Sequence, residues 1–174
     1  CYLHMIVLCL IGEDEQEVYE TLGLKFIEPE LREARGEIEE AQKDNLPSLL
    51  QLKDIKGDLH IHTKWSEGSH SIEEMAKKAL EFDYEYIAIC DHAKTLQIAQ
   101  GLDEEEYQDQ MKEIDKINEQ MDDIKILKGA EVNIDADGNL DIKNSLLKDL
   151  DIVVASIHSG FKKSQEELTE RILN

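Results

Sequence analysis

The stretch GDLHIHTKWSEGSHSIEEM, residues 57–75, decides the fold of this chain. It opens with an apolar, strand-like run that ends in His60 and His62. Residues two apart on a strand point to the same side, so the two imidazoles can bind one ion or two neighbouring ions. Ser71 followed three residues later by Glu74 is the spacing of a capping box at a helix start. The stretch therefore predicts a strand ending in paired histidines, then a turn, then a helix.

Strand-like and helix-like segments alternate from this point to the end of the chain. The predicted strands are Gly57–His62, Tyr86–Asp91, Ile124–Val132 and Asp151–His158. The predicted helices are Ser71–Phe82, Glu104–Met121, Asn144–Leu150 and Ser164–Leu173. Such alternation is typical of an α/β domain with a parallel sheet.

Residue types that bind metals stand at the ends of all four predicted strands. They are His60, His62, Asp91, His92, Glu131 and His158. The carboxyl ends of parallel strands converge on one face, so we expect these side chains to meet. Neutral imidazole suits Zn²⁺, Mn²⁺ or Fe, and carboxylates add oxygen ligands. Clustered ions of this kind bind phosphate and lower the pKa of a bridging water, which favours phosphoester hydrolysis.

The predicted metal ligands are four of these histidines and Glu131, with Glu67 in the following turn as a further candidate. A structural, hydrogen-bonded histidine stays an equal alternative for His158 taken alone. We treat His4 as a core or terminal residue and His70 as a loop residue beside the site.

Three residues close to the second histidine motif have other expected roles. Asp91 precedes His92 and points the opposite way, so it is expected to orient a ligand or cap a helix. Lys94 could offer a positive charge to a phosphate, although an exposed loop lysine is the commoner case. Cys90, in an apolar run, is expected to be a buried core thiol without a catalytic role.

Composition indicates a folded protein with one main domain. The 174 residues carry 40 acidic and 19 basic side chains, a formal net charge of -21, which repels nucleic acid unless metals or a basic partner intervene. Three cysteines without paired spacing suit a reduced, cytoplasmic setting. The apolar run Cys1–Ile11 is too short to cross a bilayer and lacks signal-peptide features, so we expect no membrane association. Because the chain does not begin with Met, we expect a piece of a longer protein.

Residues 1–51 are predicted to form a flank. A helix is expected over Glu13–Leu22, with Gly23 as its stop. An extended stretch at Phe26–Pro29 and a helix from Glu30 to about Lys43 follow, before Asn45–Pro47 breaks the pattern.

Four motifs, in order, resemble the polymerase and histidinol phosphatase (PHP) domain. They are residues 57–75, AICDHAKT (88–95), GAEVNI (129–134) and ASIHSGF (155–161). The resemblance covers the chain from about Leu52 to the end. It implies a distorted (βα)₇ barrel with two or three Mn²⁺ or Zn²⁺ ions. It carries the ligand role to His60, His62, His92, Glu131 and His158, and to Glu67, which stands where many members have Asp.

The flank EVYETLGLKFIEPELREARGEIEEA, residues 17–41, is similar to the stretch before the PHP domain of bacterial and archaeal family X DNA polymerases. This implies a 3′–5′ exonuclease and 3′-phosphatase module of DNA repair, acting on DNA 3′ ends. Residues 52–174 would be the N-terminal part of the PHP domain, with about four of seven β/α units. Its open edges would call for a homo-oligomer or domain swap. Two alternatives remain open. One is a histidinol-phosphatase-like enzyme that acts on a small phosphate ester. The other is a catalytically incomplete fragment in which metals only stabilise the fold.

Overall fold

A computed structural model describes residues 14–94 and 100–173 of the chain. The chain divides into two compact units, Cys1–Leu50 and Gln51–Asn174. The predictions for His4, for Cys1 and Cys9 and for the opening apolar run concern residues outside the described part. The two units are taken in turn, beginning with the second.

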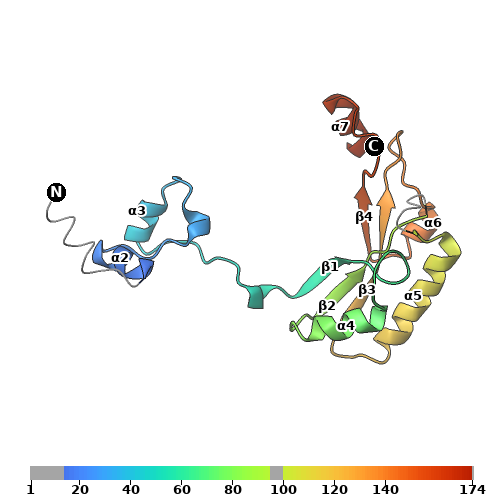
Figure 1. Cartoon of the computed structure of the whole chain (residues 1–174), viewed down its shortest axis with the longest axis horizontal. Helices are drawn as coiled ribbons and strands as arrows, with labels where there is room; N and C mark the ends of the chain where they lie inside the picture. The colour runs from blue at the N-terminus through green and yellow to red at the C-terminus, as the bar shows by residue number, and fades with distance from the viewer. Residues whose placement is uncertain (1–13, 95–99, 174) are drawn as a thin grey trace. The chain divides into compact units, whose positions relative to one another are not determined.

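The second unit is built on a four-stranded parallel sheet in the order β1-β2-β3-β4 (Figure 1). Its strands are β1 (Gly57–Ile61), β2 (Tyr86–Ile89), β3 (Lys125–Asn133) and β4 (Ile152–Ser156). The predicted parallel α/β class and partial barrel are therefore confirmed. Among the described residues β1 and β4 form the edges of the sheet, and pairing of these edges with a partner chain stays a prediction.

The predicted helices of this unit are present but shorter. They are α4 (Ile72–Leu80), α5 (Glu104–Asn118), α6 (Asn144–Leu147) and α7 (Gln165–Leu173). The capping box of α4 is confirmed, since Ser71 Oγ accepts the Glu74 N–H and the Glu74 carboxylate accepts the Ser71 N–H. None of the helices in the described residues combines the length and apolar composition needed to cross a membrane.

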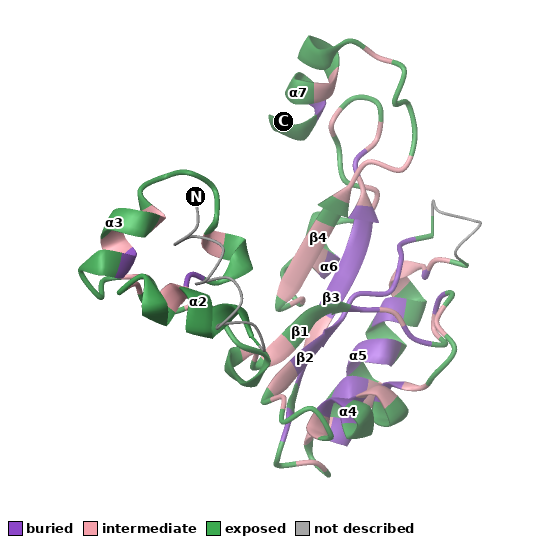
Figure 2. Cartoon of the chain, turned by 60° about the vertical axis from the view of Figure 1, so that its left-hand side comes forward, coloured by how far each residue is buried: buried purple, intermediate pink, exposed green. Residues whose placement is uncertain are grey.

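Two apolar clusters hold α4 and α5 against one face of the sheet (Figure 2). In the first, Ile61 of β1 packs with α4, α5 and strands β2 and β3. In the second, Tyr107 and Met111 of α5 pack against Ala130 and Val132 of β3. Side chains alternate along a strand, so His60 and His62 on either side of Ile61 project to the opposite face. Burial of the apolar set thus assigns the histidines to the face that the two helices leave uncovered.

The ends of the strands differ from the prediction in a way that matters for the site. β1, β2 and β4 end one to three residues before His62, His92 and His158. These histidines lie just past the ladder, whereas Glu131 lies within β3. The predicted bounds of these three strands were therefore one or two residues too long at their carboxyl ends.

The first unit contains α2 (Glu15–Thr21), a short 3-10 turn (Pro29–Leu31) and α3 (Glu37–Gln42). The predicted continuous helix from Glu30 to about Lys43 is wrong. The backbone takes a positive φ at Ala34 and Gly36, of 56° and 99°, which interrupts a right-handed helix. The Glu37 carboxylate accepts the N–H groups of Ala34 and Arg35, which fixes this turn and starts α3 after it.

Candidate metal centre

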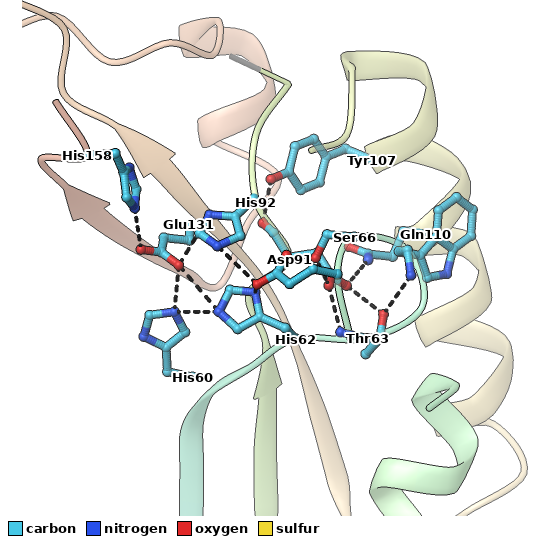
Figure 3. Close-up of polar contacts among 12 residues, drawn as sticks. His60, His62, Thr63, Ser66, Asp91, His92, Tyr107, Gln110, Glu131 and His158 are labelled. Carbon is cyan, nitrogen blue, oxygen red and sulfur yellow. Dashed lines mark hydrogen bonds and ion pairs between the residues drawn. The ribbon is translucent and has the colours of Figure 1, made fainter. Parts of the chain in front are cut away.

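One carboxylate, Glu131 on β3, lies at the centre of the predicted ligands (Figure 3). Its Oε2 is 3.1 Å from His60 Nε2, 3.3 Å from His62 Nε2 and 3.4 Å from His92 Nδ1. Its Oε1 is 3.1 Å from His158 Nε2. Four histidines from three loop or strand ends thus converge on the two oxygens of one side chain.

Glu67 approaches the same group from the loop that follows β1. Its Oε1 lies 3.1 Å from His92 Nε2 and 3.4 Å from His62 Nδ1. The rings of His62 and His92 stack, with centroids 4.6 Å apart. All six residues proposed as ligands are therefore brought together.

Backbone pairing positions the middle of this centre. His92 and Glu131 are partners in a parallel bridge that continues the β2–β3 pairing. The Glu131 N–H donates to the Asp91 carbonyl at 3.1 Å, and the Ala93 N–H donates to the Glu131 carbonyl at 3.0 Å. These two ligands are held by main-chain hydrogen bonds, so their separation does not depend on side-chain packing alone.

The donor atoms form three overlapping groups, each with all its atoms within 4.8 Å of one another. The groups are His60–His62–Glu131, His62–Glu67–His92 and His92–Glu131–His158. The Nδ1 atoms of His62, His92 and His158 are buried and have no hydrogen-bond partner among the described residues. Buried polar atoms rarely lack a partner. Imidazole nitrogens with carboxylate oxygens suit Zn²⁺ or Mn²⁺, so this donor set fits divalent cations.

Comparison with known proteins gives the same motifs a family. Residues 58–174 match the PHP domain. The chain belongs to the PHP domain family. It is 43% identical over 158 residues to a Bacillus subtilis protein named DNA polymerase/3′-5′ exonuclease PolX, a match that covers 91% of this chain and 27% of that protein.

Smaller proteins are also similar to this PHP chain. A "probable phosphatase" of Thermoanaerobacter sp. (strain X514) is 35% identical over 122 residues, covering 67% of the chain and 47% of that protein. A "probable phosphatase" of Acetivibrio thermocellus is 36% identical over 121 residues, covering 67% and 48%. The chain thus spans about a quarter of the length of PolX and about half that of these phosphatases.

The electrostatics of the PHP centre favour an ionised Glu131 beside a neutral His92. Burial raises the pKa of Glu131, but hydrogen bonds with Ser156, His60 and His158 and the electrostatic interaction with His92 outweigh it, leaving the pKa below its ordinary value. Burial lowers the pKa of His92, and the neighbouring His62 and His158 lower it further, against the opposing effect of Glu131 and Glu67. Metal ligands need these same protonation states.

The three neighbouring residues singled out in the sequence do not join the cluster. The Asp91 side chain is buried and turned toward the loop after β1 and toward α5 (Figure 3). The Lys94 ammonium pairs with Asp103, 3.0 Å away at the start of α5, and its role toward phosphate stays a prediction. Cys90 is a buried free thiol, as predicted, and burial, with the nearby charges of Asp91 and Glu131, raises its pKa to about 12. His70 is an exposed loop residue.

Sequence reasoning missed several polar residues that support the centre. Gln110 is 1% exposed on α5, where its place in the apolar spacing of Tyr107, Met111 and Ile114 was a usable signal. Arg171 of α7 had no such signal. It is buried, and its guanidinium donates to the carbonyls of Ile134, Asp135 and Ser159. Arg171 thereby joins the segments that follow Glu131 and His158.

Proposed function

We propose that this chain is a metal-dependent phosphoesterase whose natural substrate is the 3′ end of DNA. The observation that carries the proposal is the convergence of four histidines and two glutamates, with donor atoms in three groups within 4.8 Å. Without a metal role, this site would leave three buried imidazole nitrogens without a hydrogen bond, at an energetic cost.

The chain's own residues would hold the ions and leave one side of them accessible. Glu131 offers its two oxygens to different histidines, so it would hold ions together with His60 and His158. His60 has the most exposed imidazole of the four, at 39%, and marks the side from which substrate approaches. Bound divalent ions supply positive charge to a phosphate and an activated water for hydrolysis. The cluster itself contains two carboxylates, so a phosphate would be repelled without that charge.

DNA is proposed as the substrate because the likeness to PolX extends beyond the PHP match. The match to PolX covers 158 residues, whereas the PHP family accounts for residues 58–174, so the flank is part of the likeness. PolX is named as a DNA polymerase and 3′-5′ exonuclease. This supports a role of the chain as the 3′–5′ exonuclease and 3′-phosphatase module of a family X DNA polymerase in DNA repair.

The test is hydrolysis of a single-stranded oligonucleotide labelled at its 3′ end, with Mn²⁺ or Zn²⁺ added. We expect release of the labelled nucleotide, loss of release in His60→Ala, and unchanged release in His70→Ala, which removes a histidine outside the cluster. The proposal fails if the metal-loaded chain leaves 3′-hydroxyl and 3′-phosphate ends intact. Metal binding without hydrolysis of any phosphoester would instead favour ions that only brace the fold.

A small phosphate ester is the second candidate substrate, as in a histidinol-phosphatase-like enzyme. Two observations favour it: the likeness to proteins named "probable phosphatase", and the net charge of -21, which opposes binding of a long polyanion. Phosphate release from histidinol phosphate, measured beside nucleotide release from DNA at equal Mn²⁺, separates the two. Faster turnover of the small ester would replace the DNA proposal.

A further inference from the structure

We propose that Asp91 is a positioning residue, which holds the ligands His62 and Glu67 in place by fastening both ends of the loop segment between them. The inference rests on the proposed metal site and adds residues to it that bind no ion themselves. Its basis is a buried hydrogen-bond network between the loop after β1, Asp91 and α5 (Figure 3).

The contacts fall on the two residues adjacent to the ligands. Thr63 directly follows His62, and it donates its N–H and its hydroxyl to the two oxygens of Asp91, each at 2.6 Å. Ser66 directly precedes Glu67, and its hydroxyl donates to Asp91 Oδ1 at 2.5 Å. One carboxylate therefore fixes the start and the end of the segment whose flanking residues approach His92.

The other side of the network comes from α5. Gln110 donates its amide N–H to Asp91 Oδ2 at 2.6 Å, and the Tyr107 hydroxyl donates to the Asp91 carbonyl at 2.7 Å. Asp91 and Tyr107 are fully buried. Hydrogen bonds to a buried carboxylate are strong and costly to leave unmade, so the network has one satisfied arrangement. The core helix α5 thereby dictates where the loop lies.

The loop has little room to adopt another conformation. The Gly68 N–H donates to the Thr63 carbonyl at 2.9 Å, closing the segment on itself. A Cβ on Gly68 would lie 2.6 Å from the His62 carbonyl oxygen and 2.7 Å from the Thr63 carbonyl carbon, both backbone atoms. Glycine is required here because of this close approach.

Asp91 acts through these neighbours and not as a ligand. Its two oxygens together accept four hydrogen bonds, which uses the acceptor capacity of a carboxylate. The oxygens lie outside the three groups of donor atoms. Mutation of a residue that orients a metal ligand typically weakens metal affinity by about 10- to 100-fold.

The test compares Thr63→Val with Thr63→Ser in the whole chain. Valine has nearly the shape of threonine without the hydroxyl, and serine keeps the donor. Calorimetric titration with Mn²⁺ should show affinity about 10-fold weaker or more for Thr63→Val and within about threefold of wild type for Thr63→Ser. Fluorescence of Trp65, the single tryptophan, reports directly on the loop and should respond to Mn²⁺ in wild type and Thr63→Ser.

A second variant, Ser66→Ala, removes the other hydroxyl and keeps the test decisive if Thr63→Val does not fold. Ser66→Ala should also weaken Mn²⁺ binding. Its melting temperature should stay above the temperature of the titration, so that binding is measured on folded protein. Folded Thr63→Val or Ser66→Ala that binds Mn²⁺ as tightly as wild type would overturn the positioning role while leaving the proposed function intact. Wild type that binds no Mn²⁺ would overturn the proposed function and this inference with it.

Discussion

The flank and the PHP unit are stabilised by different forces. In the PHP unit two apolar clusters bury isoleucine, valine, methionine and tyrosine side chains between α4, α5 and the sheet. In the described part of the flank, Ile27 and Ala41 are the buried apolar residues. Apolar burial contributes about 25 cal/mol per Å², so the PHP unit has the larger source of stability. The flank depends on polar contacts that water and salt weaken.

Arg32 is the centre of those polar contacts. Its guanidinium makes two hydrogen bonds to the Glu15 carboxylate, at 2.8 and 2.9 Å, and one to the Ile27 carbonyl at 2.9 Å. It also lies over the rings of Tyr19 and Phe26, 5.5 and 5.4 Å from their centroids. One side chain thus joins α2 to the segment after it. The contrast between these polar contacts and the apolar core of the PHP unit can be tested.

The largest effect is expected from opening the PHP core. Ile114→Ala on α5 removes a fully buried side chain and should lower the free energy of unfolding by about 2–5 kcal/mol. Urea denaturation followed by circular dichroism measures it. The same substitution at an exposed position of the flank, Ile38→Ala on α3, should stay within about 0.5 kcal/mol. Equal effects of the two variants would remove the contrast.

Metal should stabilise the PHP unit and not the flank. Mn²⁺ at 100 times its dissociation constant should add about 2.7 kcal/mol, because it binds the folded centre and not the unfolded chain. Differential scanning calorimetry should show that Mn²⁺ raises the melting temperature of the PHP unit. Protease cleavage within residues 14–50 should proceed at the same rate with and without Mn²⁺, and protection of both units alike would contradict the division.

A smaller effect is expected from Arg32→Lys. Lysine keeps the charge but cannot form the two parallel hydrogen bonds to Glu15 or stack in the same way on the rings. Limited proteolysis should cut the flank of Arg32→Lys about two- to fivefold faster than that of wild type. This increase corresponds to the loss of one exposed ion pair. Arg35→Lys is the control, since Arg35 is highly exposed and pairs with Glu33 on the surface. An unchanged cleavage rate in Arg32→Lys would show that Arg32 does not organise the flank.

The smallest effect concerns acid. The hydrogen bond from Arg32 holds the pKa of Glu15 below its ordinary value of 4.5. A carboxylate whose pKa is lower in the folded than in the unfolded protein contributes its full stabilisation of the fold above the unfolded pKa. That contribution is lost as the pH falls through the folded pKa. As the pH is lowered below 4.5, the ring chemical shifts of Tyr19 and Phe26 should therefore change in wild type, and they should change less in Arg32→Lys. Identical titrations in the two proteins would contradict the coupling.

The order of strands and helices in the PHP unit could be predicted because apolar runs and capping residues are local signals. Ser71 with Glu74 located the start of α4 correctly. The helix predicted from Glu30 failed because composition favoured it, whereas Gly36 and the Glu37 carboxylate favour a turn. Gly36 was a local signal that should have outweighed the charge pattern.

The six proposed ligands could be named in advance because their residue types and their places beside strands both depend on short segments. Their arrangement could not be predicted. That Glu131 lies between His60 and His158 depends on the order of the strands in the sheet. The buried contacts of Arg171 join segments more than ten residues apart, which no local pattern encodes.

The bridge between His92 and Glu131 has a consequence for how the centre assembles. Their main chains are hydrogen bonded as part of folding, so the entropy of bringing these two ligands together is lost before any ion arrives. The Glu131 amide should therefore exchange its proton for deuterium slowly even in the metal-free protein. Binding of an ion at this pair would then require little reorganisation of the backbone.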